Sequence, residues 1–201
     1  MNHLRTAVYC PRDGVHLYLS TLPDNLPIPQ DDGACAHLLG SPVPSVPLIA
    51  TSGRTVNLGA LSGTVVVYFY PMIGRPDSLP LVGWNEIPGA RGCTPQSVGF
   101  RDHHAALNSL SAKVFGVSAQ PLEDQKEAKV RLGLPFELLN DSDFRLTEAM
   151  RLPMFEYETS RLIKRLTVVV IEGVIRKVFY PVFPPNRNAE DVVVWLRGGG
   201  A

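Results

Sequence analysis

The sequence contains little cysteine, and its cysteines are not clustered. Its 201 residues include three of them, Cys10, Cys35 and Cys93, and no two form a CxxC pair. An odd and sparse count argues against a structural disulfide framework and favours a reducing compartment. No cysteine and histidine cluster has zinc-ligand spacing, so we expect no metal site. The remaining question is whether one of these thiols is reactive.

An excess of charge and long apolar runs are also absent. Lysine and arginine together number 19, as do aspartate and glutamate. Without a basic field, we expect neither nucleic-acid nor membrane partners. The longest apolar runs, residues 65–70 and 167–171, are too short to cross a bilayer. The first 14 residues lack the apolar core of a signal peptide, so we expect a cytoplasmic protein.

The length suits one ordinary domain with an additional segment at one end. Residues 1–40 are predicted to be a loop-rich N-terminal extension, because proline, aspartate and glycine are dense there. Residues 41–197 form the predicted domain, and residues 198–201 form a glycine-rich tail. Within the domain, residues 72–92 are rich in proline and glycine and show no period. Loops of this length are uncommon in compact domains and are often functional.

Strand and helix patterns alternate along the predicted domain. The run VVVYFY at residues 65–70 is apolar on both faces, which is typical of a buried central strand. Strands are predicted at residues 65–70, 113–118, 136–139, 166–171 and 174–180. Helices are predicted at residues 95–110, 122–131, 143–150 and 189–196. Ser142 or Asp143 would cap the third helix, and Glu172-Gly173 would close a hairpin.

This order of elements predicts the fold class. Strands that alternate with helices and end in a hairpin favour an α/β fold, with a mixed central sheet flanked by helices. The order fits a thioredoxin-like fold, and it also suits other small α/β domains.

Cys93 lies where the long loop ends and a helix begins. The thiolate is the nucleophilic form of cysteine, and the free N–H groups and dipole at a helix start favour it. Gly92 would let the backbone approach a small substrate closely. Arg91 could add positive charge if its side chain turned inward. These features indicate a reactive thiol, whereas the simpler alternative is a buried small apolar residue, the common role of free cysteine.

Several motifs together resemble the peroxiredoxin family, and its Q-type (bacterioferritin-comigratory-protein-like) branch most of all. The motifs are FYP at residues 69–71, GCTPQ at 92–96, FRD at 100–102, GVS at 116–118, LLND at 138–141 and RLTVVVI at 165–171. The similarity covers roughly residues 40–197. It implies a thioredoxin-like fold and a thiol peroxidase that needs no cofactor. Such an enzyme reduces hydrogen peroxide or small organic hydroperoxides through a cysteine sulfenic acid.

The resemblance also assigns roles to residues. Cys93 falls on the peroxidatic cysteine, and Arg165 falls on an arginine that points at its sulfur. Gln96 matches a glutamine or glutamate of the first helical turn. The substrate-binding residues would be Gly92, Thr94 and Pro71. The simpler alternatives are a surface charge for Arg165, since arginine is mostly exposed, and a solvated helix residue for Gln96.

Three features depart from the family pattern. Ala90 stands where the family has a threonine that orients the peroxide. Residues 72–92 are an insertion, which could be a lid with Trp84 as an apolar wall or a surface decoration. Val98 occupies the position at which Q-type enzymes often carry the resolving cysteine. Cys35 and Cys10 remain as candidates for that role, and we favour regeneration by an external thiol over either of them.

The expected partners follow from this chemistry. They are a peroxide and an external thiol reductant, which could be thioredoxin, glutaredoxin or a low-molecular-weight thiol. We expect a monomer or a small homo-oligomer. Two alternatives stay open on the same fold, a non-enzymatic redox sensor and a thiol-disulfide oxidoreductase. The second is disfavoured because Gln96 stands where a CxxC motif would place its second cysteine.

Overall fold

A mixed β-sheet occupies the centre of the molecule. The structure is a computed structural model that describes residues 19–78 and 81–199. Its strands are β1 (Pro47–Ala50), β2 (Thr55–Asn57), β3 (Thr64–Phe69), β4 (Ala112–Ser118), β5 (Glu137–Asn140), β6 (Met154–Tyr157), β7 (Ser160–Ile163), β8 (Leu166–Ile171) and β9 (Val174–Phe179). Seven of them form the central sheet in the order β2-β1-β5-β4-β3-β8-β9, while β6 and β7 pair separately. Strand β3 pairs in parallel with β4 and antiparallel with β8, so it lies in the middle of the sheet.

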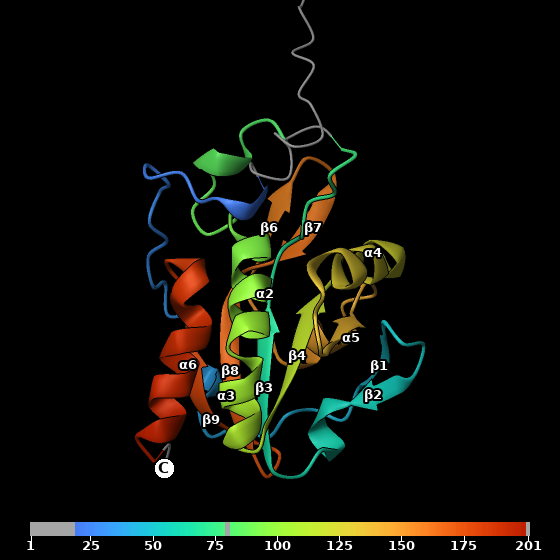
Figure 1. The fold of residues 1–201 in the computed structure, drawn as a ribbon, viewed down its shortest axis with the longest axis vertical. Coiled ribbons are helices and arrows are strands. Elements are labelled where there is room, and N and C mark those ends of the chain that lie inside the picture. The colour runs from blue at the N-terminus through green and yellow to red at the C-terminus, as the bar shows by residue number, and fades with distance from the viewer. Residues whose placement is uncertain (1–18, 79–80, 200–201) are drawn as a thin grey trace, which may run out of the picture.

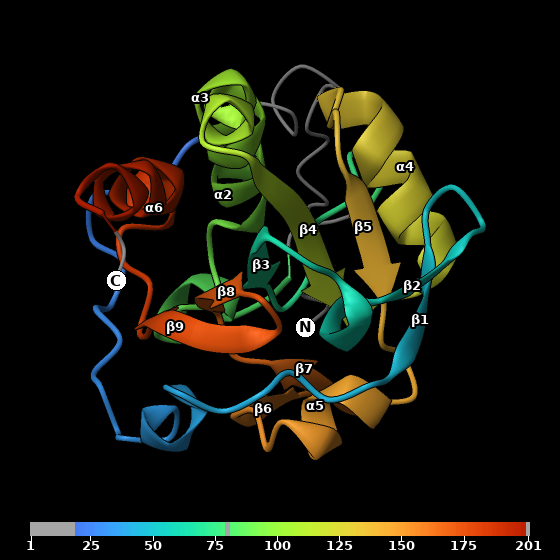
Figure 2. The same cartoon turned by 90° about the horizontal axis from the view of Figure 1, so that it is seen from below.

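Helices cover both faces of this sheet. The α-helices are α2 (Cys93–Asp102), α3 (His104–Ser109), α4 (Leu122–Leu132), α5 (Arg145–Ala149) and α6 (Asn188–Arg197). The 3₁₀ helices are η1 (Ala36–Leu38), η2 (Leu58–Ala60), η3 (Trp84–Glu86) and η4 (Pro185–Arg187). Figure 2 shows α2, α3, α4 and α6 on one side of the sheet, with α5, η1 and the β6-β7 hairpin on the other. This is the predicted α/β fold.

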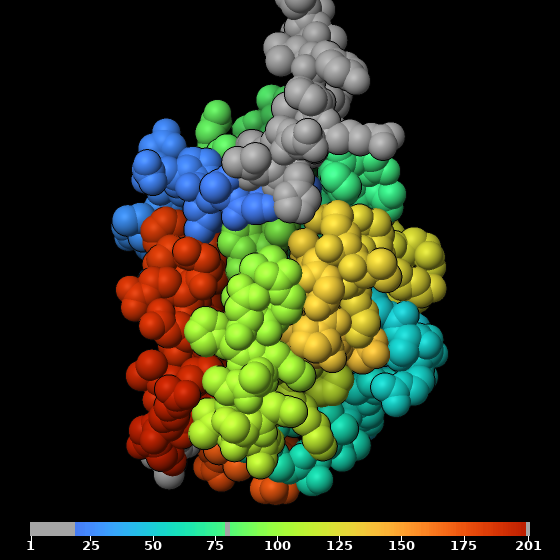
Figure 3. Space-filling model, in the orientation of Figure 1, coloured from blue at the N-terminus to red at the C-terminus, as the bar shows by residue number. Residues whose placement is uncertain are grey.

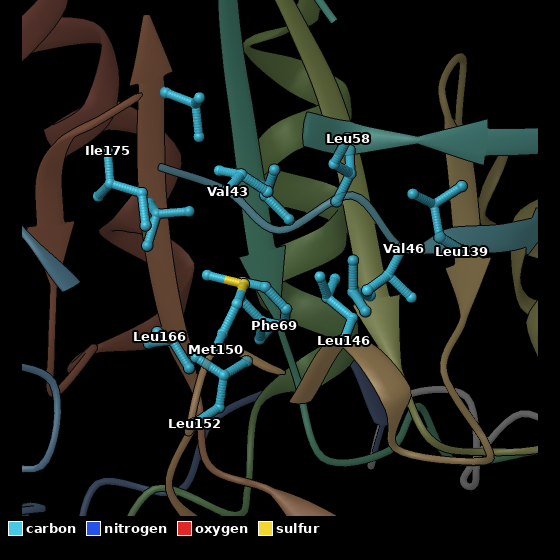
Figure 4. Packing of buried hydrophobic residues seen from close by; sticks show 14 of the residues in the cluster. Val43, Val46, Leu58, Phe69, Leu139, Leu146, Met150, Leu152, Leu166 and Ile175 are labelled. Carbon is cyan, nitrogen blue, oxygen red and sulfur yellow. The ribbon is translucent and has the colours of Figure 1, made fainter. Parts of the chain in front are cut away.

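Strand β3 separates two hydrophobic clusters. Its side chains alternate between the two faces of the sheet, as those of any strand do. The cluster that we call the Cys35 cluster contains Val65, Val67 and Phe69 together with Cys35, Leu38, Leu146, Met150 and Leu166. The Cys93 cluster, on the helical side, contains Val66 and Tyr68 together with Cys93, Phe100, Leu107 and Val192. Figure 4 shows Phe69, Met150 and Leu166 packed together in the Cys35 cluster.

The central elements agree with the sequence prediction. The run at residues 65–70 becomes β3, whose five side chains from Val65 to Phe69 are buried. The hairpin turn between β8 and β9 places both Glu172 (φ 49°) and Gly173 (φ 75°) in the left-handed region. Positive φ at both central residues is typical of the type I′ turn, a common two-residue hairpin connection.

Two helix predictions need correction. The helix expected over residues 95–110 is two helices, because the backbone leaves helical geometry at His103 (φ −92°, ψ 3°). The ring of His103 contacts the carbonyl oxygen of Gly99 at 2.9 Å, the same oxygen that its backbone N–H reaches. The cap expected at Ser142 or Asp143 is also wrong. The carboxylate of Asp141 accepts instead from the N–H groups that begin α5.

The N-terminal extension, where the structure describes it, packs on the domain. Cys35 and Leu38 are 4% and 2% exposed, and both belong to the Cys35 cluster. The Asp32 carboxylate accepts from Lys164 Nζ and from the Tyr180 hydroxyl, both at 2.8 Å. Residues 1–18, including Cys10, lie outside the described residues. In the part that is described, no helix combines the length and apolarity needed to span a bilayer.

Candidate active site

Cys93 is the first residue of α2, and the turn before it requires glycine. Gly92 has φ 107°, and a Cβ atom there would lie 2.3 Å from Cγ of Pro185. The turn buries the cysteine, which is 3% exposed. Because the helix begins at Cys93, the N–H groups of Cys93 and Thr94 have no acceptor within the helix. The sulfur therefore lies at the positive end of a helix dipole.

Arg165 reaches this sulfur from the residue before β8. Its Nη2 donates to Cys93 Sγ at 3.2 Å, and the side chain is buried rather than exposed at the surface. The same Nη2 lies 3.1 Å from the carbonyl oxygen of Ala90 and 3.2 Å from that of Arg91, while Nε donates to Gly89 at 3.3 Å. One guanidinium thus holds the reactive sulfur and the end of the insertion loop together.

Gln96 is buried and bonded, not solvated. Its side-chain oxygen accepts a hydrogen bond from Nη1 of Arg165. Its Nε2 donates to Oδ1 of Asn188 at 2.9 Å, and the Thr167 hydroxyl donates to the same oxygen at 2.7 Å. Gln96 and Thr167 are fully buried, and Asn188 is 1% exposed.

Sequence reasoning missed Thr167 and Asn188. Asn188 begins α6, where asparagine is common for reasons of local structure, so its type gave no functional signal. Thr167 is the one polar residue in an otherwise apolar strand run after Arg165. That position alone could have suggested a buried polar contact, because a buried hydroxyl needs a partner.

A cavity of about 180 Å³ opens beside the cysteine. The reactive turn contributes Arg91, Gly92, Cys93 and Thr94 to its lining. The insertion contributes an apolar wall made of Met72, Ile73, Gly74, Leu81 and Trp84, with Arg75 and Ser78, and Leu19 and Asp124 complete the lining. The insertion therefore forms part of the site.

The insertion is anchored from behind by aromatic contacts. The Trp84 ring packs edge-on against Tyr157, with centroids 5.1 Å apart, and lies 6.1 Å from Phe155. Both partners come from β6. The wall of the cavity thus depends on the hairpin that sequence patterns did not predict.

Pro71 lies outside the cavity. It is buried but is absent from the cavity lining, and its carbonyl accepts from the Ser118 hydroxyl at 3.0 Å. Ala90, which stands where the family has a threonine, is fully buried and has no hydroxyl to offer. Its carbonyl oxygen lies 3.7 Å from the cysteine sulfur.

Cys35 lies in the turn before η1 and is buried in the cluster across the sheet from Cys93. Burial raises the pKa of its thiol to about 12, and the charges of Asp32 and Asp31 add to the shift. A Cys35–Cys93 disulfide would require the structure to open, because bridged cysteines have Cα atoms within about 7 Å. Within the described residues, no group of three or more histidines, cysteines and carboxylates could hold a metal ion.

Sequence comparisons point to one family. The family model described as Redoxin matches residues 38–193. A chloroplastic peroxiredoxin Q of Oryza sativa subsp. japonica is 32% identical over 160 residues, which are 79% of this chain and 66% of the relative. The chloroplastic peroxiredoxin Q of Sedum lineare is 31% identical over 79% of this chain and 77% of the relative. Peroxiredoxin Bcp of Bacillus subtilis is 34% identical over 55% of this chain and 62% of the relative. The match to the rice protein thus spans slightly less than two thirds of its length.

Solved structures share the fold. A bacterioferritin comigratory protein of Xanthomonas campestris, whose structures concern its alkyl peroxide reduction activity, superposes with a TM-score of 0.62. It is 21% identical, and the match covers 88% of this chain and all of that one. Peroxidoxin BcpB of Mycobacterium tuberculosis superposes with a TM-score of 0.64 at 21% identity, over 80% of this chain and 96% of that one.

Proposed function

This chain belongs to the redoxin family, in its Q-type peroxiredoxin branch, and on that premise we propose that it is a thiol-dependent peroxidase. Its substrates would be hydrogen peroxide and small organic hydroperoxides. The observation that carries the proposal is the contact of 3.2 Å between Arg165 Nη2 and Cys93 Sγ at the edge of a cavity. A buried guanidinium beside a cysteine at a helix start offers N–H donors to the sulfur and to a peroxide.

The first half of the reaction needs Cys93, a peroxide and a proton from solvent. The Cys93 thiolate attacks one peroxide oxygen, a sulfur–oxygen bond forms and the oxygen–oxygen bond breaks. The second oxygen leaves as hydroxide or alkoxide and takes a proton from solvent to become water or alcohol. The sulfur is oxidised to a sulfenic acid, and the peroxide is reduced by two electrons. Arg165 and the N–H groups at the start of α2 stabilise the negative charge that develops on the oxygens.

The wall of the cavity supports an organic hydroperoxide as a substrate. Met72, Leu81 and Trp84 present apolar surface near the sulfur, and apolar surface favours an alkyl group over water. The cavity of about 180 Å³ exceeds the share of liquid volume of a water, about 30 Å³, several times. The Xanthomonas campestris relative is described for alkyl peroxides, which fits the same substrate class.

The sulfenic acid would be reduced by an external thiol. Cys35 is buried in the cluster on the opposite face of the sheet, so it does not meet Cys93 in the folded chain. The thiol that reduces the Cys93 sulfenic acid would come from thioredoxin, glutaredoxin or a low-molecular-weight thiol. A supply of reduced thiol and a sparse set of cysteines both suit the cytoplasm, which we propose as the location.

Stopped-flow peroxide reduction tests the function. The wild type should consume hydrogen peroxide and cumene hydroperoxide rapidly in the presence of a thiol, whereas Cys93→Ser should not. Cys35→Ser is the matched control and should keep the wild-type rate. Equally slow consumption by wild type and Cys93→Ser would refute the peroxidase and favour a redox sensor.

A further inference from the structure

The start of α6 packs directly on the start of α2. Figure 1 shows α6 beside α2, and Figure 3 shows their surfaces adjoining. The 3₁₀ helix η4, which leads into α6, shares this contact, and the contact depends on Gly92 before α2 and Gly99 within it. A Cβ at Gly92 would meet Pro185, and a Cβ at Gly99 would lie 3.2 Å from the carbonyl oxygen of Asn186. Between these two contacts, Asn188 reaches Gln96.

The chemistry of the donors fixes which way each amide in this chain of contacts points. A guanidinium has only N–H donors, so the Gln96 atom that faces Arg165 must be its oxygen. The other end of the same amide is then the NH₂ group, which faces Asn188 and needs an acceptor. Asn188 supplies Oδ1, and the Thr167 hydroxyl donates to that oxygen as well. Arg165 therefore donates to Gln96, Gln96 donates to Asn188, and the series ends on the Asn188 oxygen, which also accepts from Thr167.

We propose that Asn188 is a positioning residue for the peroxidase reaction. Its side-chain oxygen holds the Gln96 amide with Oε1 toward Arg165, and this orientation keeps Nη2 of Arg165 on the Cys93 sulfur. The inference rests on the proposed function and adds a residue from the C-terminal helix to the site. Asn188 does not line the cavity, and it is linked to Arg165 by its hydrogen bond with Gln96, so it acts through Gln96.

The series predicts what happens when the acceptor is lost. Without Oδ1, the NH₂ group of Gln96 is buried without an acceptor. The Gln96 side chain would then lose the contact that fixes its position, and Arg165 would lose the fixed acceptor that holds its guanidinium on Cys93. A purely structural role for Asn188 would loosen the packing of α6 without this specific effect on Arg165.

The test compares three variants by stopped-flow reduction of cumene hydroperoxide. Asn188→Leu removes the acceptor and should lower the second-order rate constant about tenfold, the loss expected for one hydrogen bond to a charged network. Asn188→Asp keeps an oxygen acceptor and should stay within about threefold of wild type. Asn186→Ala, an exposed asparagine two residues earlier, is the matched control and should keep the wild-type rate.

Alkylation of Cys93 by iodoacetamide distinguishes loss of Arg165 positioning from a general loosening of the packing of α6. Iodoacetamide has no oxygen–oxygen bond for Arg165 to polarise, so its rate constant should fall less than the peroxide rate constant in Asn188→Leu. Should Asn188→Leu fail to fold, Thr167→Val serves instead and should lower the peroxide rate in the same direction.

The inference is overturned if Asn188→Leu retains the wild-type peroxide rate, or if both rate constants fall equally. It is also overturned if Asn188→Asp is as slow as Asn188→Leu. An inactive wild type would instead defeat the proposed function itself, so the two failures are distinguishable.

Discussion

Replacing Arg165 by lysine removes the forked geometry of the site and keeps its charge. The guanidinium donates to Cys93, to the Gln96 oxygen and to three backbone carbonyls of the loop before the cysteine. An ammonium has three donors on one atom and cannot span these acceptors in the same plane. Arg165→Lys should therefore lose both sulfur alignment and loop anchoring, and Arg165→Met should lose the charge as well.

The structure sets the size of both effects. Removal of one preorganised donor at a reacting centre costs about 100-fold to 1000-fold in rate, which we expect for Arg165→Met. The free energy of unfolding should fall as well, because in Arg165→Met the fully buried Gln96 oxygen and the loop carbonyls lose their donor. An unsatisfied buried polar group costs about 1–3 kcal/mol. Water can reach part of the loop, so the total should be about 3 kcal/mol.

Two measurements check this prediction. Stopped-flow reduction of cumene hydroperoxide gives the rate constant, and urea unfolding gives the free energy of unfolding. Arg161→Met is the matched control, because Arg161 is exposed on β7, four residues from Arg165. Peroxide reduction by Arg165→Met within about threefold of wild type would refute the role given to this guanidinium.

Three further predictions concern the turn, the second thiol and the N-terminal segment. Gly92→Ala should lower the free energy of unfolding by about 3 kcal/mol, measured with urea, because φ 107° is strained for alanine and its Cβ would lie 2.3 Å from Pro185. A loss below about 1 kcal/mol would contradict the turn geometry. At about pH 8, iodoacetamide should leave Cys35 unmodified in the folded protein, because burial raises its pKa to about 12; peptide mass mapping would show this, and rapid labelling would contradict it. Lys164 donates to Asp32 and lowers the pKa of that carboxyl from 3.8 to about 2, so the associated stability is present above about pH 4 and is lost as the pH falls toward 2. The effect should be small because the pair is exposed. In urea titrations at several pH values, Asp32→Asn should reduce the dependence of the free energy of unfolding on pH. An unchanged pH dependence would show that the contact adds nothing.

The centre of the sheet could be predicted because its sequence admits few alternatives. A run that is apolar on both faces, as residues 65–70 are, has to be covered on both sides. The hairpin between β8 and β9 could be predicted from the Glu172-Gly173 turn. By contrast, β1 and β2 are only four and three residues long, and β1 gains its second partner from β5, far along the chain. Strands so short depend on their tertiary partners more than on their own pattern.

The β6-β7 hairpin also depends on a tertiary partner far away in the sequence. The residues of β6 are only partly buried or exposed, and its aromatic side chains contact Trp84 of the insertion. Neither segment has a clear period by itself. The two stabilise one another across 70 residues of sequence, so neither could be predicted before the other was placed.

In the site, the sequence predicted the reacting groups but not the residue that positions them. Cys93 and Arg165 belong to motifs that resemble those of a family, and the structure places the two side chains in contact. Asn188 belongs to no such motif. Its place depends on where α6 docks, and a buried polar contact of this kind follows from tertiary packing rather than from any local pattern.

The position of β3 separates Cys35 from Cys93. Its alternating side chains divide the core, with Val67 and Phe69 facing the Cys35 cluster and Tyr68 facing Cys93. A thiol on one face cannot reach a sulfenic acid on the other without opening strands that are paired on both sides. Cys93 is 3% exposed, and its open side is the cavity lined by the insertion. Because the insertion lines this route, we predict that a low-molecular-weight thiol regenerates Cys93 faster than a protein thiol does.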